Sequence, residues 1–454
     1  MPAPLSRTLA EFATALKFDA LPVQALEAVK IGMADTVGVM LSGIAMPVSR
    51  HVLASIGTRR RDGEARIQLG RDRASVMDAT LVNSVTTSSV VFDDVAFSGC
   101  HTSTILMPAL LAEGERIGAS GARIACAYAA GYEAWARLSE RDPDSYSSKG
   151  WHATACFGAV AAAIALANLR NLDTQTTLRA IGIAASMSGG ITASFDTDVG
   201  PFQIGRAAAG GVQAVMLAEA GMTAPEDPLE RPGRGMIVAL SPKGAVDLDT
   251  PIDDLGRTWR LESVGIHVKQ YPFGNIAQRA IDGVLDLVTA HDIKPQEVVK
   301  AEMLISDAQY AVVSKSPSVT KFVPSHSIGL AAAAAILERR ATFAELGQQF
   351  YDQPPVQEMM KRVVMVADSK IPADTTPNLG FSGGVRLHLT DGRVLESPSV
   401  DYARGHWTRR MSENELWKKF SACSADALDG SKAERLFQDL MRLERIENVA
   451  CLNA

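Results

Sequence analysis

The feature that most constrains the fold is a helical spacing of apolar residues that continues through the first two-thirds of the chain. Pro22 suits a first helical position, and the apolar residues after it recur every three or four positions as far as Leu41, with Gly43 suited to a helix end. The same spacing predicts further helices over residues 74–90, 104–117, 121–139, 153–168, 174–187 and 205–220. A chain with this pattern folds mainly as α-helix.

Alanine and glycine are frequent in these segments, as in the run from Ala159 to Ala163. Because small side chains let helices approach closely, this composition indicates a tightly packed bundle rather than a coiled coil. Facing helices of such a bundle can hold a ligand site between them. The longest apolar stretch, about residues 153–167, is mostly alanine and too short to span a bilayer, so we expect no membrane association.

The pattern changes near residue 266. Valine-rich runs at 298–305 and 363–366 predict strands, and the alternation at 384–389 leads through Thr390-Asp391-Gly392-Arg393 into Val394-Leu395, which predicts a hairpin. Helical spacing occupies residues 276–290 and 327–339 between the strands and returns at 413–420 and 431–443. We therefore expect a mainly α fold with an α+β second domain: a helical domain from residues 1–265 and 403–454, and an α+β domain from residues 266–402.

Charge and cysteine content narrow the class of protein. The 454 residues include 45 basic and 51 acidic side chains, a net charge of −6, so we expect no nucleic-acid partner. A chain of this length buries a full core without disulfides, and its five cysteines are widely spaced with no C-x-x-C pair, which fits a reducing compartment. The N-terminus has no apolar signal core, so the sequence predicts a cytoplasmic protein.

Common motifs for cofactor and metal chemistry are missing from the sequence. It contains no Walker loop, no G-x-S-x-G, no H-E-x-x-H, and no G-x-G-x-x-G followed by an acidic residue. The eight histidines include no pair at metal-ligand spacing. We therefore expect neither a cofactor nor a metal.

Two polar segments carry histidines next to predicted helices. The loop from Phe92 to His101 contains Asp93 and Asp94 and leads into a helix from about Ser103, where backbone N–H groups can receive an anion. His152 stands at the start of an alanine-rich helix. Solvated turn residues in the first case, and a core or capping histidine in the second, are the alternative interpretations.

Two further segments carry cations. In residues 199–208, Arg206 lies just inside a predicted helix start, although an exposed arginine on a solvated face explains it equally well. In residues 269–275, Lys269 lies where the two predicted domains change over, and ligand sites concentrate in clefts between domains. A plain linker remains the alternative there.

At these segments the sequence resembles the MmgE/PrpD family, which includes dehydratases, decarboxylases and epimerases. Gly150-Trp151-His152-Ala153-Thr154 matches the family's G-x-H-x-T, and Lys269-Gln270-Tyr271-Pro272 matches its K-x-Y-P. The resemblance extends in order over nearly the whole chain, through residues 9–12, 18–22, 35–43, 92–101, 108–115 and 205–223.

The resemblance implies a large helical domain built from both chain ends, a smaller α+β lid domain, and cofactor-free chemistry on small carboxylates, usually in a homodimer. It implies His152 and His101 as acid–base groups, because imidazoles exchange protons near neutral pH. It also implies Lys269 as the cation that stabilises a carbanion next to a carboxylate. The residues that it implies as substrate-binding are Arg206, Tyr271, Asp93, Gln203 and His326.

The sequence departs from the family pattern at several polar positions. Val91 stands where the family usually has Asp, and Val95 where it has Thr. Gly200 and Gln203 replace the Lys and His of the family's K-x-L-H-x-G. Gly274 and Gln278 fill the positions where a His is expected after K-x-Y-P, and His326 stands where the family often has Tyr. We therefore expect a substrate with fewer charges than a tricarboxylate, since unpaired buried carboxylates are costly.

Three functional hypotheses follow. The first is a lyase, either a dehydratase or a decarboxylase, that acts on a small carboxylic acid by proton abstraction next to a carboxylate. The second, favoured by the altered polar positions, is an isomerase or epimerase of an amino- or imino-dicarboxylate. The third is an inactive homologue that acts as a binding protein. The substrate, the acid and base roles of the two histidines, and the orientation of Asp93 and Asp94 stay open.

Overall fold

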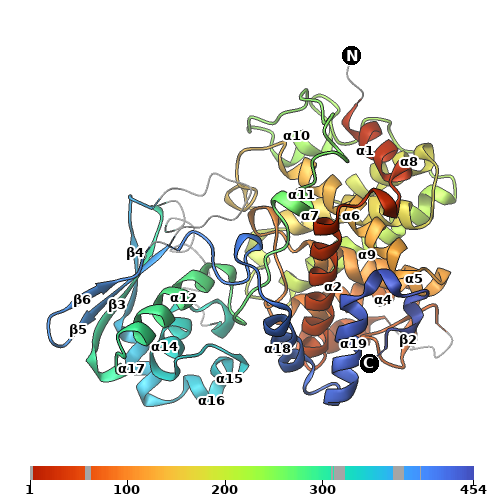
Figure 1. The fold of residues 1–454 in the computed structure, drawn as a ribbon. Helices are drawn as coiled ribbons and strands as arrows, with labels where there is room; N and C mark the ends of the chain where they lie inside the picture. Colours follow the sequence, from red (N-terminus) through yellow and green to blue (C-terminus); the bar gives the residue numbers. More distant parts are fainter. Residues whose placement is uncertain are drawn as a thin grey trace. The chain divides into compact units, whose positions relative to one another are not determined.

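The computed structural model describes residues 4–56, 63–307, 310, 323–371, 383–398 and 400–453. The chain divides into two compact units, Met1–Ile266 with Ser412–Ala454, and His267–Met411 (Figure 1). The sequence pattern predicts residues 403–411 in the helical domain, whereas the structure packs them in the second unit. There the backbone N–H of Arg404 donates to Asp282, Arg409 pairs with the same carboxylate, and the carbonyl of Gly405 accepts from Val268.

The first unit consists mainly of helices drawn from both chain ends (Figure 1). Its α-helices are α1 (Leu5–Ala15), α2 (Val23–Gly43), α3 (Pro47–Ser55), α4 (Val76–Ser88), α5 (Thr102–Ile117), α6 (Gly121–Ser139), α7 (Ala153–Leu169), α8 (Thr174–Ala185), α9 (Val199–Glu219), α10 (Met236–Leu240), α11 (Arg260–Ser263), α18 (Glu413–Ser424) and α19 (Gly430–Met441). Short 3-10 helices include η2 (Phe97–Gly99) and η4 (Thr192–Ser194). The predicted helical bundle is confirmed, and a two-residue antiparallel hairpin, β1 (Ala65–Arg66) with β2 (Arg73–Ala74), adds to it.

Small residues set how closely the helices of the first unit approach. On α9, a Cβ at Gly205 would lie 2.4 Å from a methyl of Val85 on α4, and one at Gly211 would lie 2.4 Å from the Cβ of Ala162 on α7. Both distances are shorter than carbon atoms tolerate, so these positions require glycine. α7 itself is almost entirely buried, which explains why its sequence is alanine-rich on every side.

Helix α9 begins six residues earlier than the apolar spacing predicts, at Val199 instead of 205. Pro201 therefore lies in its first turn, where a missing backbone N–H costs no hydrogen bond. The earlier start places Gln203 and Arg206 on one helix. Within the described residues no single helix is long and apolar enough to cross a membrane, while α2 and α3, bent by 88°, pass that test only as a pair.

The second unit is an α+β fold, as the sequence predicts. Its four-stranded sheet has the order β4 (Val363–Ala367), β3 (Val298–Ile305), β5 (Gly384–Leu389), β6 (Val394–Glu396), with β3 parallel to β4 and the other neighbours antiparallel. The predicted β5–β6 hairpin is confirmed. The helices are α12 (Asn275–Ala290), α14 (Ile328–Glu338), α15 (Phe343–Leu346), α16 (Gln348–Tyr351) and α17 (Pro354–Arg362), with short 3-10 turns that include η7 (Pro324–His326) and η8 (Trp407–Arg409).

Alternation along β5 separates the two faces of this sheet. Val385, Leu387 and Leu389 are buried in the core that α12, α14 and α17 complete (Figure 1). Arg386 and His388 point to the other face, where both approach Glu302 of β3. One buried and one polar face is the arrangement expected of a sheet covered by helices on a single side.

Candidate active site

The two candidate catalytic histidines occupy the same position on neighbouring helices of the first unit. His101 is the N-cap of α5 and His152 the N-cap of α7, and neither side chain makes a capping hydrogen bond. The backbone N–H of His101 donates to Oγ1 of Thr154, 3.1 Å away, which ties the start of α5 to the first turn of α7. The capping interpretation of His152 is therefore wrong for its side chain.

His101 is paired with a buried carboxylate. Its Nδ1 lies 2.7 Å from Oδ2 of Asp93, whose side chain is fully buried, and Thr104 donates to the same oxygen at 2.5 Å. An ionised carboxylate only accepts hydrogen bonds, so Nδ1 carries the proton and Nε2 of the neutral ring is left as an acceptor. Asp93 thus fixes the orientation of the His101 ring and leaves its Nε2 as an acceptor.

His152 is held as a neutral ring. It is 8% exposed, and its backbone N–H donates to the carbonyl of Gly190 at 2.9 Å. Burial, reinforced by the neighbouring His101 and opposed by Asp93, lowers its pKa to about 3. This burial fits the alternative interpretation of His152 as a core histidine.

Gln203 determines which nitrogen of His152 carries the proton. Its Oε1 accepts the backbone N–H of Ile191 at 2.5 Å, so the other end of the amide must be its NH₂ group. That NH₂ group lies 3.4 Å from Nδ1 of His152, which makes Nδ1 the acceptor and Nε2 the N–H donor. The ring of Phe195 stands edge-on to the same imidazole, with 4.9 Å between centroids. Gln203 therefore acts on the histidine and on the loop at Ile191.

The two neighbouring aspartates face different surroundings. Asp93 faces His101, whereas Asp94 lies with Asp35 and Ser103 in the helical core. Burial, and next the charge of Asp35, raise the pKa of Asp94 well above its usual range. The orientation that the sequence left open is thus different for each residue.

Lys419 connects the C-terminal helix α18 to this region. Its Nζ lies 2.5 Å from Oδ1 of Asp35, donates to the carbonyl of Phe92 at 2.8 Å, and lies 3.9 Å from the centre of the Phe92 ring. Phe92 directly precedes Asp93, so Lys419 fixes the backbone that carries the partner of His101. Sequence reasoning missed this residue, because nothing in an amphipathic helix marks one lysine as buried.

Arg206 uses its guanidinium within the fold. Nη1 donates to the carbonyl of Met187 at 3.2 Å and Nη2 to that of Gly189 at 2.5 Å. These contacts hold the turn whose next residue, Gly190, accepts the backbone N–H of His152. The structure therefore brings Arg206, Gln203 and His152 together through the turn at 187–190.

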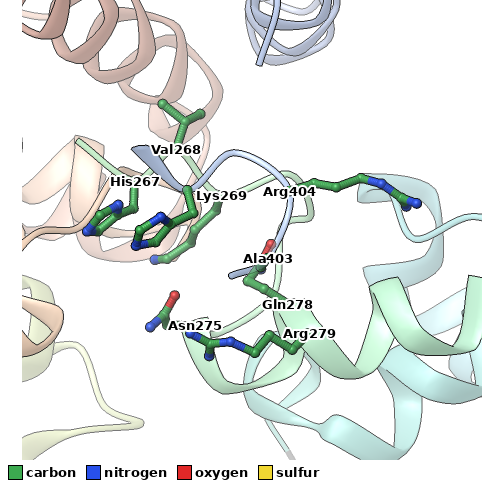
Figure 2. A pocket seen from close by; sticks show the side chains of 9 residues that line it. His267, Val268, Lys269, Asn275, Gln278, Arg279, Ala403 and Arg404 are labelled. Atoms are coloured by element: carbon green, nitrogen blue, oxygen red, sulfur yellow. The ribbon is translucent and has the colours of Figure 1, made fainter. Parts of the chain in front are cut away.

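Lys269 lies in the second unit, where it lines a small pocket (Figure 2). The side chain is buried, and the other residues that line the pocket are His267, Val268, Asn275, Gln278, Arg279, Ala403, Arg404 and His406. The nine include lysine and arginine but no carboxylate. A pocket with this lining favours an anion.

Two other residues near Lys269 in the sequence, Tyr271 and Gln278, help to build the second unit. The hydroxyl of Tyr271 donates to Asp282 at 2.7 Å. Oε1 of Gln278 accepts the N–H groups of Gln270 and Tyr271, and its NH₂ group donates to Tyr271 and Phe273, so Gln278 fixes the K-x-Y-P turn. His326 lies beside Gly274, outside the residues that line the pocket.

The arrangement in the first unit is suited to proton transfer. It offers an imidazole acceptor at His101 and an imidazole donor at His152, both at helix N-termini, where the partial positive charge favours an anionic ligand. Within the described ranges, no three His, Cys, Asp or Glu side chains come close enough together to hold a metal ion.

Comparisons with known proteins connect these features to a family. The MmgE/PrpD N-terminal domain matches residues 7–249, and the MmgE/PrpD C-terminal domain matches residues 271–443. Similar curated proteins include cis-aconitate decarboxylases from Mus musculus and Homo sapiens, each 26% identical over 82% of this chain and covering 77% and 78% of their own lengths. The cis-aconitate decarboxylase of Aspergillus terreus is 20% identical over 98% of this chain and 94% of its own length. The chain belongs to the MmgE/PrpD family.

Proposed function

We propose that this protein is a cofactor-independent lyase that acts on a small carboxylic acid through a carbanion next to a carboxylate. The observation that carries the proposal is the Asp93–His101 pair at 2.7 Å beside the neutral His152. The relatives named as cis-aconitate decarboxylases support a lyase and favour loss of CO₂ over loss of water.

In this proposal the two histidines have different roles. Nε2 of His101 is the general base, because Asp93 accepts its Nδ1–H and stabilises the imidazolium that forms. Nε2–H of His152 donates a hydrogen bond to a carboxylate oxygen of the substrate and stabilises the charge that develops there. The role of His152 as a donor rests on the orientation of Gln203.

The reaction requires a proton and an electron pair to be accounted for. In a decarboxylation the C–C bond to the leaving carboxylate breaks and CO₂ departs. The electron pair stays on the adjacent carbon, next to a second carboxyl group. His101, which has taken up a proton from solvent at Nε2 beside Asp93, returns that proton to the carbon. In a dehydration the same imidazole would first take the proton from carbon, and hydroxide would then leave. We propose Lys269 as the cation that stabilises the negative charge in either case.

A product survey tests the proposal. The protein is incubated with mono-, di- and tricarboxylates, hydroxylated and unsaturated, and the mixtures are analysed by mass spectrometry and proton NMR. We expect one dicarboxylate or related acid to lose CO₂ or water, and Asp93→Asn to slow that loss. Change of configuration with unchanged composition would identify an isomerase instead. Binding without any conversion would identify an inactive homologue.

A further inference from the structure

His267 in the second unit presents a buried N–H group that no described residue accepts. The side chain is 5% exposed, and its Nδ1 accepts the backbone N–H of Trp407 at 3.1 Å. In a neutral ring the proton is therefore on Nε2. Nε2 is buried and has no hydrogen-bond partner among the described residues, and an unmet buried donor is costly enough to require an explanation.

The ring is fixed as a neutral donor by its surroundings. It stacks on His406 with 3.9 Å between centroids and 11° between planes, and Nδ1 of His406 in turn accepts the N–H of Thr408. Burial, together with His406 and Arg279, lowers the pKa of His267 well below its usual range. Neither ring can turn its protonated nitrogen away without losing a backbone hydrogen bond.

The pocket that His267 lines is built to receive a negative group. In Figure 2 the side chains of Lys269, Asn275 and Arg279 converge on it, while Arg404 extends away toward its partners Asp282 and Asp286. Asn275 begins α12, a helix of 16 residues, so the positive end of that helix adds to the lysine and arginine charges. The cavity volume is about 20 Å³, which is room for one water-sized group such as a single carboxylate oxygen and not for a whole dicarboxylic acid.

We propose that His267 Nε2–H, together with Lys269 and Arg279, binds one carboxylate group of the substrate in this pocket. The inference rests on the proposed function for the identity of the ligand as a carboxylic acid. His267 is then a substrate-binding residue that discriminates a carboxylate from a neutral group, and the rest of the substrate lies outside the pocket.

Calorimetric titration of the full chain with succinate, in a buffer free of carboxylates, tests the inference. His267→Phe keeps a flat ring to stack on His406 but removes both the N–H donor and the acceptor of the Trp407 N–H, so its fold is first checked by circular dichroism. We expect it to weaken succinate binding by about 10- to 100-fold, the usual effect of losing a hydrogen bond to a charged group. His291→Gln, at an exposed histidine that ends α12, should bind succinate like the wild type.

Imidazole NMR of the wild-type protein provides a measurement that does not depend on the variant folding. With ¹⁵N-labelled histidine, succinate should shift the His267 Nε2–H resonance, while a matched uncharged diamide should not. Equal succinate affinity in His267→Phe, no shift of the resonance, or no carboxylate binding by the wild type would overturn the inference. Turnover is measured separately. If His267→Phe binds succinate as well as an active wild type does, this site alone is refuted. If binding depends on His267 but the wild type converts no substrate, the proposed function alone is refuted.

Discussion

At the scale of single residues, the backbone is strained two residues before Asp93 of the candidate site. Val91, directly before Phe92 and Asp93, has φ +57°, in the left-handed region where a β-branched side chain crowds the backbone. The family pattern usually has Asp at this position, and Asp and Asn tolerate that conformation best after glycine. This chain therefore keeps a strained residue next to the loop that holds the partner of His101.

Relief of this strain is measurable. Val91→Asn should raise the free energy of unfolding by about 1 kcal/mol, the usual cost of an unsuitable residue in the left-handed region. Val90→Asn, at the neighbouring half-buried valine without a positive φ, is the control and should be neutral or destabilising. Urea denaturation of both variants gives their free energies of unfolding. A Val91→Asn protein that is less stable than the control would contradict the strain argument.

The buried His152 predicts how stability depends on pH. Its pKa is near 3 in the folded protein and 6.5 in an unfolded chain, so the unfolded chain binds a proton between these values that the folded protein does not. The histidine therefore costs no stability above pH 6.5 and about 3 kcal/mol by pH 4. In urea denaturation from pH 7 to pH 4.5, His152→Gln should lose less stability than the wild type. Parallel curves would mean that the imidazole titrates normally.

At the scale of elements, a helix from the C-terminal end of the chain supports a loop near residue 92. Lys419 on α18 is buried with Asp35 of α2 and with the carbonyl of Phe92. Removing one member of a buried ion pair leaves the other charge without compensation, which is far more damaging than losing an exposed pair.

The prediction for this contact concerns stability first. Lys419→Met should lower the free energy of unfolding by about 3–5 kcal/mol. The double variant Lys419→Met with Asp35→Asn should recover part of that loss, because the unpaired carboxylate is then neutral. Thermal and urea unfolding of the two proteins provide the comparison. Equal losses in the single and double variants would show that the lysine acts through packing alone.

Most elements could be predicted from the sequence, and the reasons are local. Apolar spacing predicts α2, α5, α6, α7 and α12, and alternation with a turn predicts the β5–β6 hairpin. The early start of α9 could not be predicted, because Gly200 and Pro201 read as loop residues until a helix is known to follow. Likewise, a boundary at residue 403 is the natural choice when the contacts of Asp282 with Arg404 and Arg409 are unknown.

The residues of the candidate site also fall into those that the sequence predicts and those that only the fold reveals. His101, Asp93, His152 and Lys269 follow from short motifs, because each motif carries its chemistry within a few residues. The roles of Arg206, Gln278 and Tyr271 do not, since each depends on carbonyls or carboxylates that the fold supplies. His267 gives no sequence signal, because only the folded chain reveals that its Nε2 is buried without a partner.

At the scale of the whole molecule, we propose a homodimer formed through the helical unit. Met216 and Met222 near the end of α9 are 51% and 47% exposed, and we expect a second copy of the chain to cover them. Light scattering at micromolar concentration should give twice the mass of the chain, and Met216→Asp should lower it. A wild-type monomer would contradict the proposal.

The central claim is that the two histidines of the first unit act on a carbon acid. His101 transfers the proton, and His152 stabilises the negative charge that develops. Hydrogen–deuterium exchange at carbon tests it most directly: the substrate found in the product survey, or its product, is incubated in D₂O and followed by proton NMR. We predict exchange with the wild type, and rates lower by about 10²–10⁴-fold in His101→Gln and His152→Ala, both folded by circular dichroism. Exchange at the wild-type rate in both variants would contradict the account.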